Sequence, residues 1–151
     1  MNKQGVAIDI LLVEDNEGDA RLAKEAFKES KILNRVSHVL DGVEAMAFLR
    51  KEGKYADVPR PHLILLDLNL PRKDGREVLS EIKSDECLKR IPVVVLTTSN
   101  DERDIFKTYD LHVNCYITKP IDFEQFLQVV RSIKDFWLTI VQLPGNGCSK
   151  E

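Results

Sequence analysis

Short hydrophobic runs alternate along the chain with longer segments in which hydrophobic residues recur every three or four positions. The short runs are rich in Val, Ile and Leu and are hydrophobic on both faces, which is typical of strands inside a parallel sheet. Such strands are predicted at residues 8–13, 36–40, 63–66, 93–98 and 113–117, and the run at 36–40 is the weakest of them.

Each short run is followed by a segment whose hydrophobic residues have helical spacing. Helices are predicted at residues 17–30 and 42–49, after Gly75, and at residues 100–109 and 122–143. Asn16 and Asp122 suit the N-cap position, where a side-chain oxygen accepts from a backbone N–H group. Strict alternation of strands and helices predicts a doubly wound α/β fold. In this (βα)5 arrangement, helices cover both faces of a five-stranded parallel sheet, and the C-terminal helix is extended.

The length of 151 residues, with 43% hydrophobic residues, is that of one domain able to bury a full core. The sequence contains no internal repeat and no low-complexity segment. We therefore expect a single domain over residues 1–151. Its core would cover about 8–135, and a C-terminal helix extension and tail would cover about 136–151.

The net charge of −3 argues against a general nucleic-acid-binding protein, because that function usually needs clustered Lys and Arg. No hydrophobic run approaches the roughly 18 residues that span a bilayer, and the first residues are too polar for a signal peptide. Cys87, Cys115 and Cys148 lack metal-ligand spacing, so we interpret them as reduced thiols. These features predict a cytoplasmic protein without a nucleic-acid or membrane partner.

Polar residues that can carry chemistry stand at the carboxyl ends of four predicted strands. They are Glu14, Asp15, Asp67, Thr97 and Lys119. In a parallel sheet these ends lie along one edge, where open α/β folds bind their ligands. Each residue could instead be a helix cap or a turn residue, but capping explains their joint placement poorly. The sequence therefore predicts a functional site at this edge.

Three carboxylates at one edge repel one another, and at an effective dielectric constant near 20 each close pair costs about 4 kcal/mol. Lys119 offers one positive charge against Glu14, Asp15 and Asp67, which leaves an excess of two negative charges. Oxygen ligands without His or Cys favour Mg²⁺ as the neutralising ion. With a lysine and a hydroxyl group nearby, the set fits phosphoryl transfer in which Asp67 is the nucleophile.

These residues carry a resemblance to a known family. Glu14-Asp15, Asp67 followed by L-N-L-P-R-K-D-G, Thr97 and Lys119-Pro120 together resemble the receiver domain of two-component response regulators. The resemblance covers nearly the whole chain. It implies the flavodoxin-like strand order 2-1-3-4-5, which is also that of CheY.

The resemblance also implies a role for each matching residue. Asp67 would be the phosphoacceptor, and Lys119 the active-site lysine that pairs with the phosphoryl group. The metal ligands would be Glu14, Asp15, Asp67 and the backbone carbonyl of Asn69, and the switch residues would be Thr97 and Tyr116. The Lys119-Pro120 bond is expected to be cis.

The last predicted helix is hydrophobic around about half of its circumference, more than packing on one face of a sheet requires. The surplus stripe consists of Val129, Ile133, Phe136 and Ile140. We expect this stripe to be the interface of a homodimer, and the alternative is that loops or neighbouring helices cover it. Residues 136–144 resemble receiver-only regulators associated with phytochrome-type sensor kinases.

We therefore expect a stand-alone receiver that takes a phosphoryl group from a sensor histidine kinase onto Asp67 in a Mg²⁺-dependent reaction. The resemblance of residues 136–144 implies that this kinase is phytochrome-like. By resemblance it catalyses its own phosphorylation and dephosphorylation but is not an enzyme that turns over a metabolite. One alternative is a phosphate-independent interaction module of the same fold. Another is a hydrolase or flavin carrier. A hydrolase needs a cap domain, and a flavodoxin needs a hydroxyl-rich loop where this chain has E-D-N-E-G-D.

Overall fold

The structure is a computed structural model that describes residues 7–30, 32–98 and 115–141 and, within the last range, the side chains of residues 116–132. The predicted helix at 100–109 lies outside the described residues. None of the described helices is both long and hydrophobic enough to cross a bilayer.

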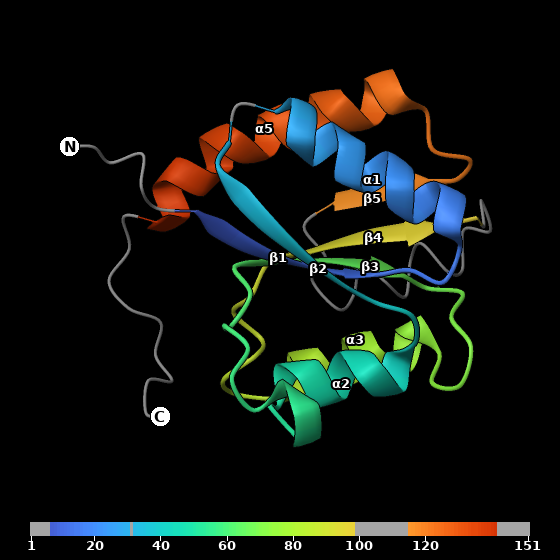
Figure 1. Cartoon of the computed structure of the whole chain (residues 1–151), viewed down its shortest axis with the longest axis vertical. Helices are drawn as coiled ribbons and strands as arrows, with labels where there is room; N and C mark the ends of the chain where they lie inside the picture. The colour runs from blue at the N-terminus through green and yellow to red at the C-terminus, as the bar shows by residue number, and fades with distance from the viewer. Residues whose placement is uncertain (1–6, 31, 99–114, 142–151) are drawn as a thin grey trace.

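Five parallel strands form one sheet in the order β2-β1-β3-β4-β5 (Figure 1). The strands are β1 (Ile8–Val13), β2 (Asn34–Val39), β3 (Leu63–Asp67), β4 (Val93–Thr97) and β5 (Cys115–Thr118). The predicted parallel sheet and its strand order are thus confirmed. The second strand begins two residues before the prediction and ends one residue before it, because Asn34 and Arg35 pair with the first residues of β1 despite their polarity.

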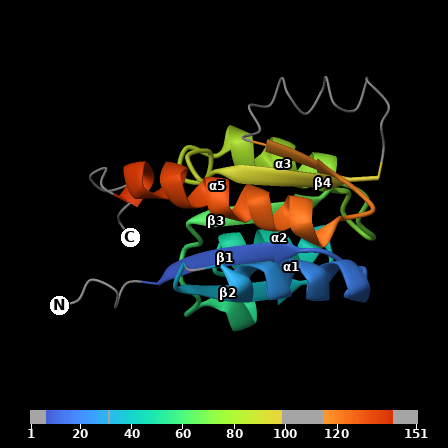
Figure 2. The same ribbon diagram turned by 90° about the horizontal axis from the view of Figure 1, so that it is seen from above.

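Helices cover both faces of this sheet (Figures 1 and 2). One face carries α1 (Glu17–Glu29) and α5 (Phe123–Val141), and the other carries α2 (Gly42–Leu49) and α3 (Gly75–Ser84); a short 3-10 helix, η2 (Gly53–Tyr55), follows α2. The ring of Phe27 in α1 meets that of Phe126 in α5 edge to face, with centroids 6.1 Å apart. The doubly wound α/β fold with a long C-terminal helix is therefore confirmed.

The sheet separates two layers of core, and the central strand β3 contributes to both. Alternate side chains of a strand point to opposite faces. Ile64 and Leu66 therefore pack toward α2 and α3, while Leu63 and Leu65 pack toward α1 and α5. All five residues of β3 are buried, which explains why its sequence shows no polar alternation.

Helix starts follow the capping pattern of the sequence. The Asn16 side chain accepts from the Asp19 N–H group at 2.8 Å, and the Asp122 side chain accepts from the Glu124 N–H group at 2.9 Å. Asp74 and Glu77 form a capping box at the start of α3. These caps fix where each helix leaves the edge of the sheet that carries the acidic residues.

The interpretation of all three cysteines as reduced thiols is wrong for Cys87, whose sulfur is disulfide-bonded in the structure. Its partner lies outside the described side chains. Metal-ligand spacing along the chain carries no information on this bond, because a disulfide depends on the distance between two cysteines in the folded protein.

Candidate functional site

Three acidic side chains meet at the carboxyl edge of the sheet. Asp67 is the last residue of β3, and Glu14 and Asp15 directly follow β1. One ligand oxygen from each lies within 4.8 Å of the others. Glu14 is 0% exposed and Asp67 is 2% exposed, while Asp15 faces solvent. The predicted cluster is therefore present, and most of its charge is buried.

Lys119 is the cation of this cluster. Its Nζ lies 2.8 Å from Glu14 Oε1 and 3.1 Å from Asp67 Oδ2, and its side chain is only 7% exposed. The Lys119 N–H group donates to the Thr97 carbonyl oxygen at 2.7 Å, which ties the lysine to the end of β4. The bond between Lys119 and Pro120 is cis, as the family resemblance implies.

A fourth carboxylate, which sequence reasoning missed, also reaches this lysine. Asp19 Oδ2 in the first turn of α1 lies 3.1 Å from Lys119 Nζ. Asp19 stands one helical turn beyond the acid pair. Acids are common in the first turn of a helix because the helix dipole stabilises negative charge there. The sequence therefore offered no signal that separates this acid from an ordinary helix-start residue.

Burial and charge shift the pKa values of this cluster. Burial raises the pKa of Glu14 from 4.5 to about 7, against the opposing effect of hydrogen bonds from Lys119 and the Asn16 N–H group. Burial alone would lower the pKa of Lys119, but its hydrogen bond to Glu14 and the charge of Asp67 outweigh this and raise it. Lys119 is therefore a permanent cation, and Glu14 is the group whose charge responds near neutral pH.

The raised pKa of Glu14 predicts a pH-dependent stability of the metal-free protein. Between about pH 4.5 and 7 the folded protein retains a proton that the unfolded chain releases, so the free energy of unfolding should fall as the pH rises. The shift corresponds to about 3 kcal/mol. Urea unfolding with a chelator present, compared between wild type and Glu14→Gln, measures this contribution. Parallel pH profiles of the two proteins would contradict it.

The donor set fits a hard divalent cation. Glu14, Asp15 and Asp67 offer carboxylate oxygens, which Mg²⁺ and Mn²⁺ prefer. Glu14 Oε1 is a buried oxygen without a hydrogen-bond partner among the described residues, although Lys119 Nζ lies at ion-pair distance. Glu14, Asp15 and Asp67 would hold such an ion, and the ion would compensate charge that one lysine leaves unbalanced.

The loop after β3 fixes the orientation of the Asp67 carboxylate. Asp67 Oδ1 accepts from the Asn69 N–H group at 3.0 Å, while Oδ2 faces Lys119. The Asn69 side chain donates to the Thr98 hydroxyl at 2.9 Å and so links this loop to the end of β4. The role of the Asn69 carbonyl as a metal ligand stays a prediction.

The other predicted residues take up different positions. Thr97 ends β4 and is 2% exposed, and Tyr116 in β5 packs against the core layer of α2 and α3. Their switching role stays a prediction. In the proposed interface stripe, Val129 is partly buried, whereas the side chains of Ile133, Phe136 and Ile140 lie outside the described residues.

Comparison with known proteins agrees with this geometry. Residues 10–131 match the family model of the response regulator receiver domain. The chain is 56% identical over 136 residues to the response regulator Rcp1 of Synechocystis sp., an alignment that covers 90% of this chain and 92% of the relative. It is also 46% identical over 137 residues to a probable methanogenesis regulatory protein, FilR2, of Methanothrix harundinacea, with coverage of 90% and 87%.

Two solved structures are similar along almost their full length. The phosphorylated cyanobacterial phytochrome response regulator RcpA has a TM-score of 0.81 and 60% identity, over 93% of this chain and 100% of that chain. The Mn²⁺-bound form of the response regulator Rcp1 has a TM-score of 0.80 and 54% identity, over 91% and 99% of the two chains.

Proposed function

The chain belongs to the response regulator receiver family, and from this premise we propose that it accepts a phosphoryl group onto Asp67 from a sensor histidine kinase. The observation that carries the proposal is the geometry of Asp67. Its carboxylate is 2% exposed, lies 3.1 Å from Lys119 Nζ and shares a 4.8 Å cluster with Glu14 and Asp15.

In the proposed reaction an Asp67 oxygen attacks phosphorus as the bond from phosphorus to the donor atom breaks. The donor, a kinase histidine nitrogen or the oxygen of a small phosphodonor, leaves with the electron pair. Lys119 stabilises the negative charge of the phosphoryl oxygens, and the hydrogen bond from the Asn69 N–H group holds the carboxylate in place. A bound Mg²⁺ supplies further charge compensation for the transferred group. In the proposed self-catalysed dephosphorylation, water would attack phosphorus, inorganic phosphate would be released and the Asp67 carboxylate would be restored. The proposed role is signalling and not the turnover of a metabolite.

Phosphorylation would act as a switch because it replaces the single negative charge of the Asp67 carboxylate with a phosphoryl group of about −1.5 to −2 charges, in a site already rich in acids. The hydroxyl of Thr97 at the end of β4 and the ring of Tyr116 in β5 are the proposed responding groups. Both lie near Lys119. The Thr97 carbonyl accepts from the Lys119 N–H group, and Tyr116 stands on β5, which ends one residue before the lysine. A change in charge can thereby bias a two-state arrangement of this side of the sheet.

The proposed metal is Mg²⁺, and the proposed upstream partner is a phytochrome-like histidine kinase. The similar Rcp1 structure holds Mn²⁺, an ion with the same preference for oxygen ligands, and RcpA is a phytochrome response regulator. We also place the homodimer interface on the α5 stripe that includes Val129. The single described sheet and its helices support one domain. We also propose that the protein works in the cytoplasm.

Intact-mass measurement with a small-molecule phosphodonor tests this proposal. We expect one phosphoryl addition in Mg²⁺ and none when the ion is chelated, because Lys119 alone cannot balance the acids and the incoming group. Size-exclusion chromatography with light scattering on the same samples reports whether the chain is a dimer and whether phosphorylation changes this state. Equal phosphorylation with and without the metal would contradict the proposed mechanism.

A further inference from the structure

His38 stands at the open edge of the sheet, beside the loop that carries the acid pair. Its ring Nε2 lies 2.7 Å from the carbonyl oxygen of Glu14, across 24 residues of sequence. A carbonyl oxygen only accepts hydrogen bonds, so Nε2 carries the proton and donates. This distance is at the short end for an N–H···O bond.

This hydrogen bond lies just beyond the last residue of β1. The last residue of β1 is Val13, which pairs with Val39, and α1 starts only at Glu17. Between them, the Glu14 N–H group still donates to the Val39 carbonyl at 3.1 Å. His38 binds the Glu14 carbonyl, so residues of β2 hold both the N–H group and the carbonyl of Glu14.

The Glu14 carbonyl belongs to the peptide group that joins Glu14 to Asp15. Fixing this planar group limits the rotation on either side of it. The two acids differ in support, because Glu14 is buried and bonded to Lys119 whereas Asp15 is exposed. The direction of the Asp15 carboxylate therefore depends on the peptide group that His38 holds.

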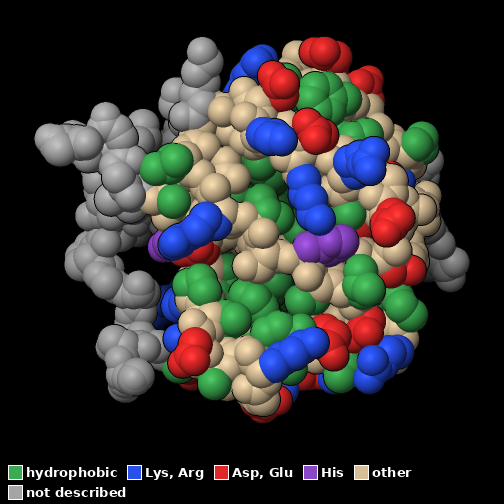
Figure 3. Space-filling model, in the orientation of Figure 1, with side chains coloured by type: hydrophobic (Ala, Val, Ile, Leu, Met, Phe, Trp, Pro, Cys, Tyr) green, Lys and Arg blue, Asp and Glu red, His purple; other side chains and the backbone are tan. Residues whose placement is uncertain are grey.

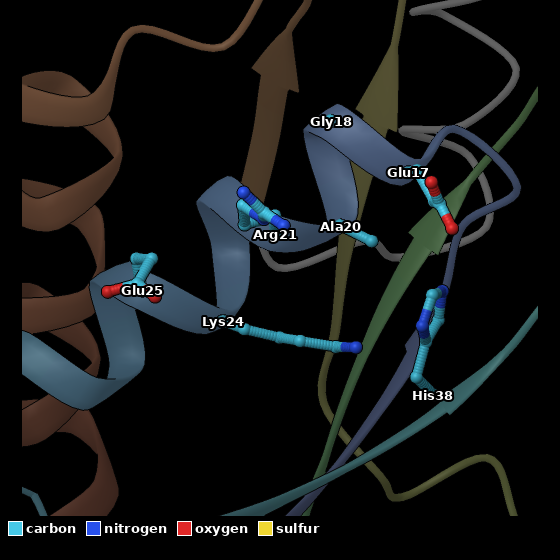
Figure 4. Close-up of a pocket in the computed structure, with 7 residues that line it drawn as sticks. All are labelled: Glu17, Gly18, Ala20, Arg21, Lys24, Glu25 and His38. Atoms are coloured by element: carbon cyan, nitrogen blue, oxygen red, sulfur yellow. The ribbon is translucent and has the colours of Figure 1, made fainter.

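The ring faces α1 across a hollow. His38 lines a hollow of about 550 Å³ between α1 and β2, together with residues of α1. Figure 4 shows the side chains of Glu17 and Lys24 extending from α1 toward the ring. Acidic and basic side chains are interspersed over the face of the molecule that Figure 3 shows. His38 thus lies at the junction of β2, α1 and the acid-bearing loop.

We propose that His38 is a positioning residue of the metal site, which orients Glu14 and Asp15 toward a divalent cation by holding the peptide group between them. The inference rests on the proposed function, since it concerns the same site. It assigns a role in metal binding to a residue of the edge strand that does not itself touch the ion. Hydrogen bonds that orient metal ligands affect affinity strongly, and their loss commonly weakens binding by 10- to 100-fold.

The test compares two amides that differ by one methylene group. In His38→Gln the amide nitrogen stands about where Nε2 stands and can donate to the Glu14 carbonyl. In His38→Asn it stands about where Nδ1 stands and falls short. We expect the Mn²⁺ dissociation constant, measured by calorimetry, to rise about tenfold in His38→Asn and to stay within about twofold of wild type in His38→Gln.

A second histidine provides the control for general loosening of β1. The His62 ring accepts from the Asp9 N–H group at 3.0 Å, at the opposite edge of the sheet. His62→Asn should retain wild-type Mn²⁺ affinity, while unfolding in a chelator reports the stability of every variant. Equal Mn²⁺ affinity of wild type and His38→Asn, equal losses in His38→Asn and His62→Asn, or no rescue by His38→Gln would each overturn the inference. Failure of the wild type to bind Mn²⁺ would overturn the proposed metal site as well.

Discussion

An Asp67→Asn variant is expected to gain no phosphoryl group under conditions that modify the wild type. The carboxamide keeps the shape of the side chain but is a poor nucleophile, so the transfer loses its acceptor. Asp67 is 2% exposed, and its two oxygens are held by Lys119 and the Asn69 N–H group, so the substitution removes the carboxylate that the site positions. Intact mass after incubation with phosphodonor and Mg²⁺, and after incubation with a phosphorylated kinase, measures the loss.

Asp9→Asn is the matched control for this prediction. Asp9 is also a strand acid and is 9% exposed, but it pairs with Arg35 at the opposite edge of the sheet, 2.9 Å from the guanidinium. Removing its charge tests whether loss of any buried strand carboxylate impairs the reaction. Asp9→Asn should be phosphorylated like the wild type. Phosphorylation of Asp67→Asn to the wild-type extent would remove Asp67 from the mechanism.

Gly75→Ala is expected to destabilise the protein by about 3 kcal/mol or more and to slow phosphorylation at least tenfold. Gly75 begins α3, and its N–H group donates to the Leu68 carbonyl at 3.0 Å. A Cβ atom at this position would lie 2.2 Å from the Asp67 carbonyl oxygen and 2.5 Å from Leu68 Cα. Both are backbone atoms, so the clash is relieved only by moving α3 or the end of β3 that carries Asp67.

Gly18→Ala separates this clash from the effect of adding a methyl group to a helix start. Gly18 lies in the first turn of α1 and is exposed, and its added Cβ would approach only the Asn16 side chain, at 3.3 Å. We expect its stability to stay within about 1 kcal/mol of wild type, since alanine favours helix. Urea unfolding and the initial phosphorylation rate measure both variants. If Gly75→Ala matches Gly18→Ala in both measurements, the close packing of α3 on Asp67 is unimportant.

Much of the fold was predictable because the strands are buried on both faces. The hydrophobic runs at 8–13 and 63–66 have the length of strands and are short for helices, and the structure places β1 and β3 there. That the acids at the ends of these strands would lie close together was also predictable, because the carboxyl ends of parallel strands meet at one edge of the sheet. The polar edge strand β2 was predicted less well, because an edge strand needs fewer hydrophobic residues.

The features that the sequence did not predict are contacts between residues that no periodic pattern connects. Nothing in the sequence links His38 to the Glu14 carbonyl or Asp19 to Lys119, because each contact depends on the placement of an edge strand or a helix turn. The close approach of Gly75 to Asp67 was hidden for a similar reason. The Asp-Gly pair before α3 predicts a turn and a helix cap, but not which backbone atoms the glycine must accommodate.

The surroundings of Lys119 also limit what its ammonium group can do next. An ammonium group has three hydrogens, and three carboxylates, those of Glu14, Asp19 and Asp67, lie within 3.1 Å of the Lys119 nitrogen. Its donor valence is therefore filled, and a new acceptor can enter only by exchange with one of the three. Asp19 is the most exposed of them, at 24%, and water can satisfy it at least cost. When Lys119 takes a new acceptor, the contact that it loses first should therefore be the one with Asp19, on the first turn of α1.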